Sequence, residues 1–129
     1  AIGDLTHLQE LHLRHNRLTA LPVTIGGLTA LKILSLQENQ LITLPATIGN
    51  LANLTELDLR NNRLTALPLA LGELSNLRVL DLRGNRLAKL PVTLAQLPRL
   101  EKLDLRWNSL ASPPAWLHHL AARGCVVYL

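Results

Sequence analysis

The chain has 129 residues and a formal net charge of +4, and its single cysteine is Cys125. This length suits one domain, and a single cysteine excludes a disulfide within the chain. No stretch approaching about 18 apolar residues is free of charged side chains, so a membrane-spanning helix is excluded. Leucine accounts for 35 residues whereas phenylalanine and methionine are absent, which indicates a core built from one repeated side chain.

A frame of 23 residues recurs five times, LxxLxLxxNxLxxLPxx[IL]xxLxx, with asparagine at position 9 and proline at position 15. The copy at residues 54–76 is LTELDLRNNRLTALPLALGELSN. The repeated asparagines are Asn16, Asn39, Asn62, Asn85 and Asn108.

We predict one domain over residues 1–129, with a partial repeat at 1–7, five repeats at 8–122 and a terminal strand at 123–129. Residues 2–7, IGDLTH, match the end of a repeat. In the terminal segment RGCVVYL, Val126 and Tyr128 are expected at the leucine positions of a sixth strand. Because the chain starts inside a repeat, we expect it to be a fragment of a longer array or of a multidomain protein.

Each repeat predicts a short strand and then a single helical turn. In the first, Leu11 and Leu13 alternate with Glu10, His12 and Arg14, the period of a half-buried strand. Proline fixes φ and lacks an N–H, so it marks the crossing to the other layer. Stacked copies bury a continuous core, and their parallel strands lie about 4.8 Å apart.

We expect the repeated asparagines to hold the loops together. The amide offers two donors and one acceptor, enough to bond backbone groups of its own repeat and the next one. These five residues therefore form a structural ladder rather than a functional site.

The repeats resemble those of leucine-rich repeat proteins, whose L-x-x-L-x-L-x-x-N-x-L core they match. The 23-residue LPxxIGxLxx form is similar to the intracellular Ras-group-related subclass and to bacterial repeats. The resemblance implies an α/β, right-handed solenoid with a concave parallel sheet and a convex side of short helical turns. It also implies a protein partner, such as a signalling GTPase, kinase or phosphatase, or a neighbouring domain.

Parallel stacking turns equivalent positions into columns on the concave face. The acidic column, from position 5, holds Asp58, Asp81 and Asp104, and the basic column, from position 7, holds Arg60, Arg83 and Arg106. Two interpretations remain open. The charges neutralise one another and fix the register, or they form a bipolar surface that selects a partner.

Tryptophan and arginine are enriched at interface hot spots, so we predict that Trp107 and the three arginines bind the partner while the aspartates set its polarity. Trp107 is expected to be largely exposed, and its alternative role is to fold over the last turn as a cap. Trp116 is expected to cap the back of the final repeat.

Other sites are rejected. His12, Ser35 and Asp58 share a column, but there the serine rather than the histidine lies in the middle, so no catalytic triad is expected. The histidines at 7, 12, 15, 118 and 119 lack further ligands at zinc-like spacing. Nucleic acid is not expected despite the basic pI, because Trp107 is the lone stacking aromatic on that face. We predict no enzyme activity, no cofactor and no membrane partner.

Three further expectations concern the whole chain. The first strand has an unpaired edge, which invites self-association there or through Cys125. The absence of cysteine-rich caps predicts a cytoplasmic location. As alternatives to partner binding, the chain is an architectural spacer, a regulatory fragment of a larger GTPase, kinase or ligase, or an engineered scaffold.

Overall fold

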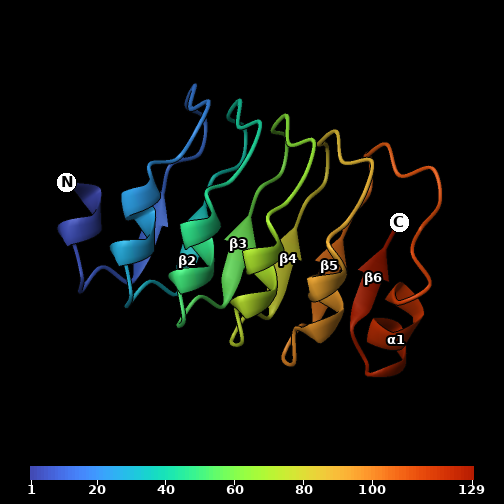
Figure 1. The fold of residues 1–129 in the computed structure, drawn as a ribbon. Coiled ribbons are helices and arrows are strands. Elements are labelled where there is room, and N and C mark those ends of the chain that lie inside the picture. Colours follow the sequence, from blue (N-terminus) through green and yellow to red (C-terminus); the bar gives the residue numbers. More distant parts are fainter.

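The computed structural model describes residues 1–129 as a stack of repeats with one parallel six-stranded sheet (Figure 1). Each strand pairs with the next in register, so that Leu11 lies beside Leu34 and Leu34 beside Leu57. In sheet order the strands are β1 (Glu10–His12), β2 (Ile33–Ser35), β3 (Glu56–Asp58), β4 (Val79–Asp81), β5 (Lys102–Asp104) and β6 (Val126–Tyr128). The predicted α/β repeat fold is confirmed.

The second layer consists of short helical turns, as the sequence predicts. They are η1 (Ile2–Asp4), η2 (Val23–Gly27), η3 (Ala46–Asn50), η4 (Leu69–Glu73), η5 (Val92–Gln96) and the six-residue helix α1 (Leu117–Ala122). The proline before each of η2 to η5 is extended, with φ between −69° and −67°, and the turn begins at the following residue. Neighbouring turns pack closely, because a Cβ at Gly26 would lie 2.8 Å from the Thr47 carbonyl oxygen.

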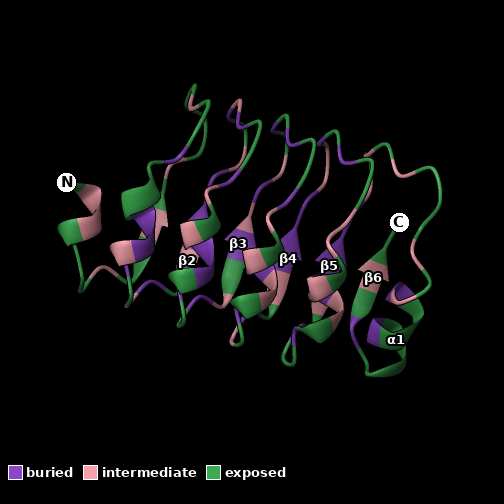
Figure 2. Ribbon diagram, viewed as in Figure 1, coloured by how far each residue is buried: buried purple, intermediate pink, exposed green.

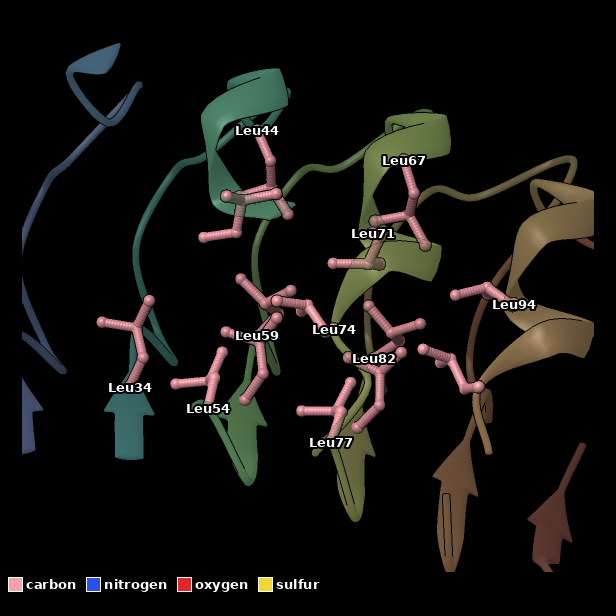
Figure 3. Packing of buried hydrophobic residues seen from close by; sticks show 14 of the residues in the cluster. Leu34, Leu44, Leu54, Leu59, Leu67, Leu71, Leu74, Leu77, Leu82 and Leu94 are labelled. Carbon is pink, nitrogen blue, oxygen red and sulfur yellow. The ribbon is translucent and has the colours of Figure 1, made fainter. Parts of the chain in front are cut away.

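Leucine and isoleucine side chains from both layers meet between the sheet and the helical turns. Figure 3 shows Leu34, Leu59 and Leu82 from the strand side pointing into the space between the layers, with Leu71 and Leu74 entering it from the fourth helical turn and the segment after it. Buried residues line the space between the layers while the outer surfaces are largely exposed (Figure 2). Fully burying one leucine side chain contributes about 1.5–3 kcal/mol, so one repeated residue suffices to hold the stack together.

The asparagine ladder is present, but its direction differs from our prediction. Asn62 Nδ2 donates to the carbonyl oxygens of Leu36 and Leu59, and its Oδ1 accepts from the Leu41 N–H at 3.1 Å. Leu36 and Leu41 belong to the preceding repeat rather than the following one. Asn16 has no preceding repeat, is exposed, and bonds only the Leu13 and Arg14 carbonyls of its own repeat.

The last strand is displaced by one residue from its predicted register. Val127 pairs with Leu103 at the inward position, while Val126 and Tyr128 pair with Lys102 and Asp104. The fifth repeat is therefore one residue longer, because it contains an α-helix in place of a 3-10 turn. A shift of one residue moves every side chain of a strand to the opposite face, so Tyr128 lies on the outer face of the sheet.

The ends of the stack also differ from the repeats between them. At the N-terminal end η1 packs beside η2, while β1 pairs with β2 alone. At the C-terminal end Trp116 packs on the core, and Cys125 is 5% exposed. Burial raises the pKa of the Cys125 thiol. A buried thiol is poorly placed to link two chains, which disfavours the expected dimer through Cys125. None of the helices has the length and hydrophobicity needed to cross a bilayer.

Candidate partner-binding face

The candidate site is the outer, concave face of the sheet. Each strand directs its middle residue into the core and its two outer residues away from it, so equivalent residues form rows across the sheet. The row from the last strand residue consists of His12, Ser35, Asp58, Asp81, Asp104 and Tyr128.

The predicted acidic and basic columns come together as one network, which we call the Asp–Arg network (Asp58, Asp81, Asp104, Arg60, Arg83 and Arg106). Arg83 bonds Asp81 of its own repeat at 2.6 Å and approaches Asp104 of the next repeat at 3.3 Å. Arg60 bonds Asp58 at 2.8 Å and lies 3.6 Å from Asp81. At the C-terminal end, Arg106 bonds Asp104 at 2.7 Å. The network links three repeats and neutralises its own charge.

The network is more deeply buried than a set of surface ion pairs. The Asp104 side chain is 0% exposed, whereas Arg106 is 38% exposed and lies over it. Burial alone would raise the pKa of Asp104, but hydrogen bonds from the Arg106 side chain and backbone, with the positive charges of Arg106 and Arg83, outweigh it and lower that pKa. The hydrogen bond to Asp81 conversely raises the pKa of Arg83.

Aromatic and apolar side chains collect at the C-terminal end of the face. The Arg106 guanidinium lies 4.7 Å from the ring centre of Tyr128 and 5.7 Å from that of Trp107. Trp107 is 71% exposed, as predicted, and a hollow of about 110 Å³ beside it is also lined by Leu105 and Leu129. The sequence predicted Trp107 here but missed Tyr128, because the longer last repeat hides its position.

Trp107 occupies a backbone position that favours glycine. Position 8 of every repeat has positive φ, and Gly84 fills it in the fourth repeat. The other occupants are His15, Glu38, Asn61 and Trp107, with φ between 55° and 60°. The left-handed conformation costs a residue with a Cβ about 1–2 kcal/mol.

At the N-terminal end His12 lies between a serine and a carboxylate. Its Nδ1 is 3.0 Å from Ser35 Oγ and its Nε2 is 3.1 Å from Glu10 Oε1. The carboxylate is that of Glu10. Comparing equivalent positions of different repeats does not reveal this contact, because Glu10 and His12 belong to the same strand. An oxyanion hole is commonly formed by the N–H after the serine, but here the Leu36 N–H donates to the Asp58 carbonyl at 2.8 Å. The trio therefore acts as a hydrogen-bonded part of the surface.

A second histidine pair lies nearby, where His15 Nδ1 is 2.6 Å from Glu38 Oε2. The structure brings no three histidine, cysteine, aspartate or glutamate side chains into a geometry that would hold a metal ion. His12 thus contacts a carboxylate of its own strand, and His15 contacts a carboxylate of the next repeat.

Solved structures with the same fold come from bacteria and plants. A leucine-rich repeat protein of Leptospira interrogans is 44% identical, with a TM-score of 0.88, over 90% of this chain. The leucine-rich repeat ectodomain of the receptor kinase SOBIR1 from Arabidopsis thaliana is 32% identical (TM-score 0.77, 92% of this chain). An internalin from Listeria monocytogenes is 25% identical (TM-score 0.84, 99% of this chain). The chain spans 30%, 66% and 36%, respectively, of their lengths.

Among curated proteins, none matches the chain. The family model described as "Leucine rich repeat" matches residues 6–64 and 52–110, which together cover most of the sequence. The repeat frame, the parallel sheet and this match agree, and the chain belongs to the leucine-rich repeat family.

Proposed function

We propose that the chain binds a protein partner on its concave face, with Trp107 as the apolar anchor. Domains of the leucine-rich repeat family are generally protein-interaction modules. The proposal adds the face and the residues that contact the partner.

The placement of Trp107 carries the proposal. A large aromatic ring is 71% exposed at a position with φ of 60°, where glycine would avoid the conformational cost. Strained positions cluster at ligand-binding sites, because binding energy or function offsets the cost. Burying the ring against a partner would gain the apolar area that it now exposes to water.

The backbone around Trp107 favours binding without rearrangement. Asn108, which follows it, bonds the Leu82 carbonyl at 2.9 Å and the Leu87 N–H at 3.0 Å. A preformed surface loses little conformational entropy on association, so a few anchors are enough for affinity. The charges of the Asp–Arg network neutralise one another, so we expect its partly exposed arginines to orient the partner. Trp107 would supply most of the binding free energy.

A pull-down from an extract of the organism that produces the chain tests this function. Trp107→Ser should lose the partner, with binding of the purified partner weakened roughly tenfold, as for a hot-spot residue. The matched control is Leu69→Ser, which removes a 65% exposed apolar side chain from η4 on the opposite layer and should leave capture unchanged.

The same experiment separates the alternatives. Equal capture by the wild type and Trp107→Ser, together with loss in Leu69→Ser, would move the binding site to the helical layer. If neither the wild type nor either variant captures a specific protein, the chain is better explained as an architectural spacer or scaffold.

A further inference from the structure

We propose that the partner segment on the concave face is an acidic, extended stretch of protein, held by a stripe of three unpaired arginines. The arginine stripe consists of Arg17, Arg63 and Arg86, each of which directly follows a ladder asparagine. The inference rests on the proposed binding function and adds the chemistry of the partner.

The charge of the stripe is uncompensated. Arg17, Arg63 and Arg86 are exposed, and the arginines that form ion pairs are Arg60, Arg78, Arg83 and Arg106. In the Asp–Arg network each of the three arginines pairs with an aspartate, so the network adds no net charge to the face. In the repeats of the network the cationic surplus therefore lies at position 10, whereas at position 7 only Arg14 of the first repeat is exposed without an ion pair.

The backbone holds the stripe in place. The Arg63 N–H donates to the Leu41 carbonyl and the Arg86 N–H to the Leu64 carbonyl, each at 2.9 Å. One residue further along, the Leu64 N–H donates to Asn85 Oδ1 at 3.1 Å. The backbone at position 10 of each repeat is thus hydrogen-bonded to the repeat before it. These bonds fix the backbone from which each arginine side chain of the stripe extends.

The spacing fits an extended peptide that crosses the repeats. With strands about 4.8 Å apart, Arg63 lies about 10 Å from Arg17 along the stack, and Arg86 about 5 Å further. Alternate side chains of an extended strand are about 6.7 Å apart, so three carboxylates at every second residue span about 13 Å and reach all three arginines through their flexible side chains. Trp107 lies one repeat beyond Arg86 and would meet an apolar residue at the end of that segment.

A protein segment fits this surface better than nucleic acid. Single-stranded nucleic acid is bound by successive stacked aromatic side chains beside a basic groove. Here the exposed aromatic side chains, Trp107 and Tyr128, both lie at the C-terminal end of the face and not along the stripe. A nucleic-acid strand would therefore gain no base stacking along the stripe.

The probe is a fluorescein-labelled peptide, Leu-Ser-Glu-Ser-Glu-Ser-Glu-Ser-Leu, measured by fluorescence anisotropy at 150 mM salt. The double variant Arg63→Gln/Arg86→Gln should bind it roughly tenfold more weakly. The control Lys32→Gln/Arg99→Gln removes the same charge from exposed positions outside the stripe and should change affinity less than twofold. Trp107→Ala should weaken binding roughly fivefold, and all variants should keep the wild-type melting curve because the altered side chains are exposed.

Three results would overturn the inference. The first is equal weakening by both double variants, which would mean nonspecific attraction by net charge. The second is tighter binding of a labelled nine-nucleotide thymidine strand that depends on Arg63 and Arg86, which would indicate a nucleic-acid site. The third is a natural partner that Trp107→Ser loses but Arg63→Gln/Arg86→Gln keeps, which would leave the proposed binding function intact and refute the acidic segment alone.

Discussion

The side chain of one asparagine joins two repeats. Asn62 Nδ2 and Oδ1 together bond four backbone groups, and two of these belong to the preceding repeat. The residue is 6% exposed, so its bonds are shielded from water. Its contribution to stability should therefore exceed that of an asparagine at the open end of the stack.

We predict that Asn62→Ala lowers the free energy of unfolding by about 1–3 kcal/mol, because it leaves the buried Leu41 N–H without an acceptor and removes one of the two asparagine donors to the Leu36 carbonyl. Asn16→Ala is the matched control. It removes an exposed side chain that bonds only its own repeat, so it should change stability by less than about 0.5 kcal/mol. Urea unfolding followed by circular dichroism measures both, and equal losses would refute the role of the preceding repeat.

At the scale of the elements, the sheet carries an acid-sensitive network. The pKa of Asp104 is lowered in the folded state from an ordinary value of 3.8. A carboxyl group whose pKa falls on folding stabilises the protein above its unfolded pKa and loses that contribution as the pH falls through the native value. The contribution of Asp104 should thus begin to decline as the pH falls below about 3.8 and be lost at still lower pH.

We predict that Asp104→Asn costs about 1–3 kcal/mol at pH 7, because it leaves Arg106 without a charged partner and Arg83 with Asp81 alone. The variant should also show a shallower loss of melting temperature between pH 5 and pH 2 than the wild type. Asp4→Asn, which alters a side chain 83% exposed at the other end of the chain, serves as control. Parallel curves for all three proteins would contradict a stabilising role for the network carboxylate.

The elements show how far sequence reasoning reaches. The 23-residue spacing predicted β1 to β5 and the helical turns, because each repeat supplies the same alternation and the same proline. One of its two interpretations of the charged columns, mutual neutralisation, requires the arginines of position 7 to meet the aspartates of position 5, as they do in the structure. It could not place Tyr128, since the register of β6 depends on α1 using one residue more than a 3-10 turn.

Other features depended on distances that spacing does not encode. The repeat spacing places Asp81 and Asp104 on the concave face but does not reveal that both are buried there, Asp104 fully. Likewise, the contact between His12 and Glu10 requires a particular side-chain conformation within one strand. The division of arginines into paired and unpaired sets became visible only from the distances in the structure.

At the scale of the whole molecule, the sheet has an open edge along β1. The Ile33 N–H bonds the Gln9 carbonyl of the repeat before it, so the equivalent N–H of Glu10 points to the side where no strand lies. Unpaired edges promote association between sheets. Self-association at this edge remains our prediction, as does the cytoplasmic location expected from the sequence.

We predict a concentration-dependent dimer in sedimentation velocity experiments. Glu10→Pro should reduce dimerisation at least roughly tenfold, because proline removes the free N–H of the edge without breaking a bond to β2. Glu10→Ala keeps that N–H and is the control. Monomeric wild-type protein at millimolar concentration would disprove the prediction, and equal dimerisation of the two variants would place the contact elsewhere.

The direction of the asparagine bonds makes the two ends of the array unequal. Each asparagine from Asn39 onward bonds the repeat before it, so deleting a repeat from the C-terminal side leaves an N–H of the remaining neighbour without its acceptor, as the Leu41 N–H would lose Asn62 Oδ1. Deleting one from the N-terminal side leaves only an asparagine that keeps its bonds within its own repeat, as Asn16 does. Removing repeats from the N-terminus should therefore lower the stability of the remaining repeats less than removing them from the C-terminus. Each repeat depends on the one that follows it.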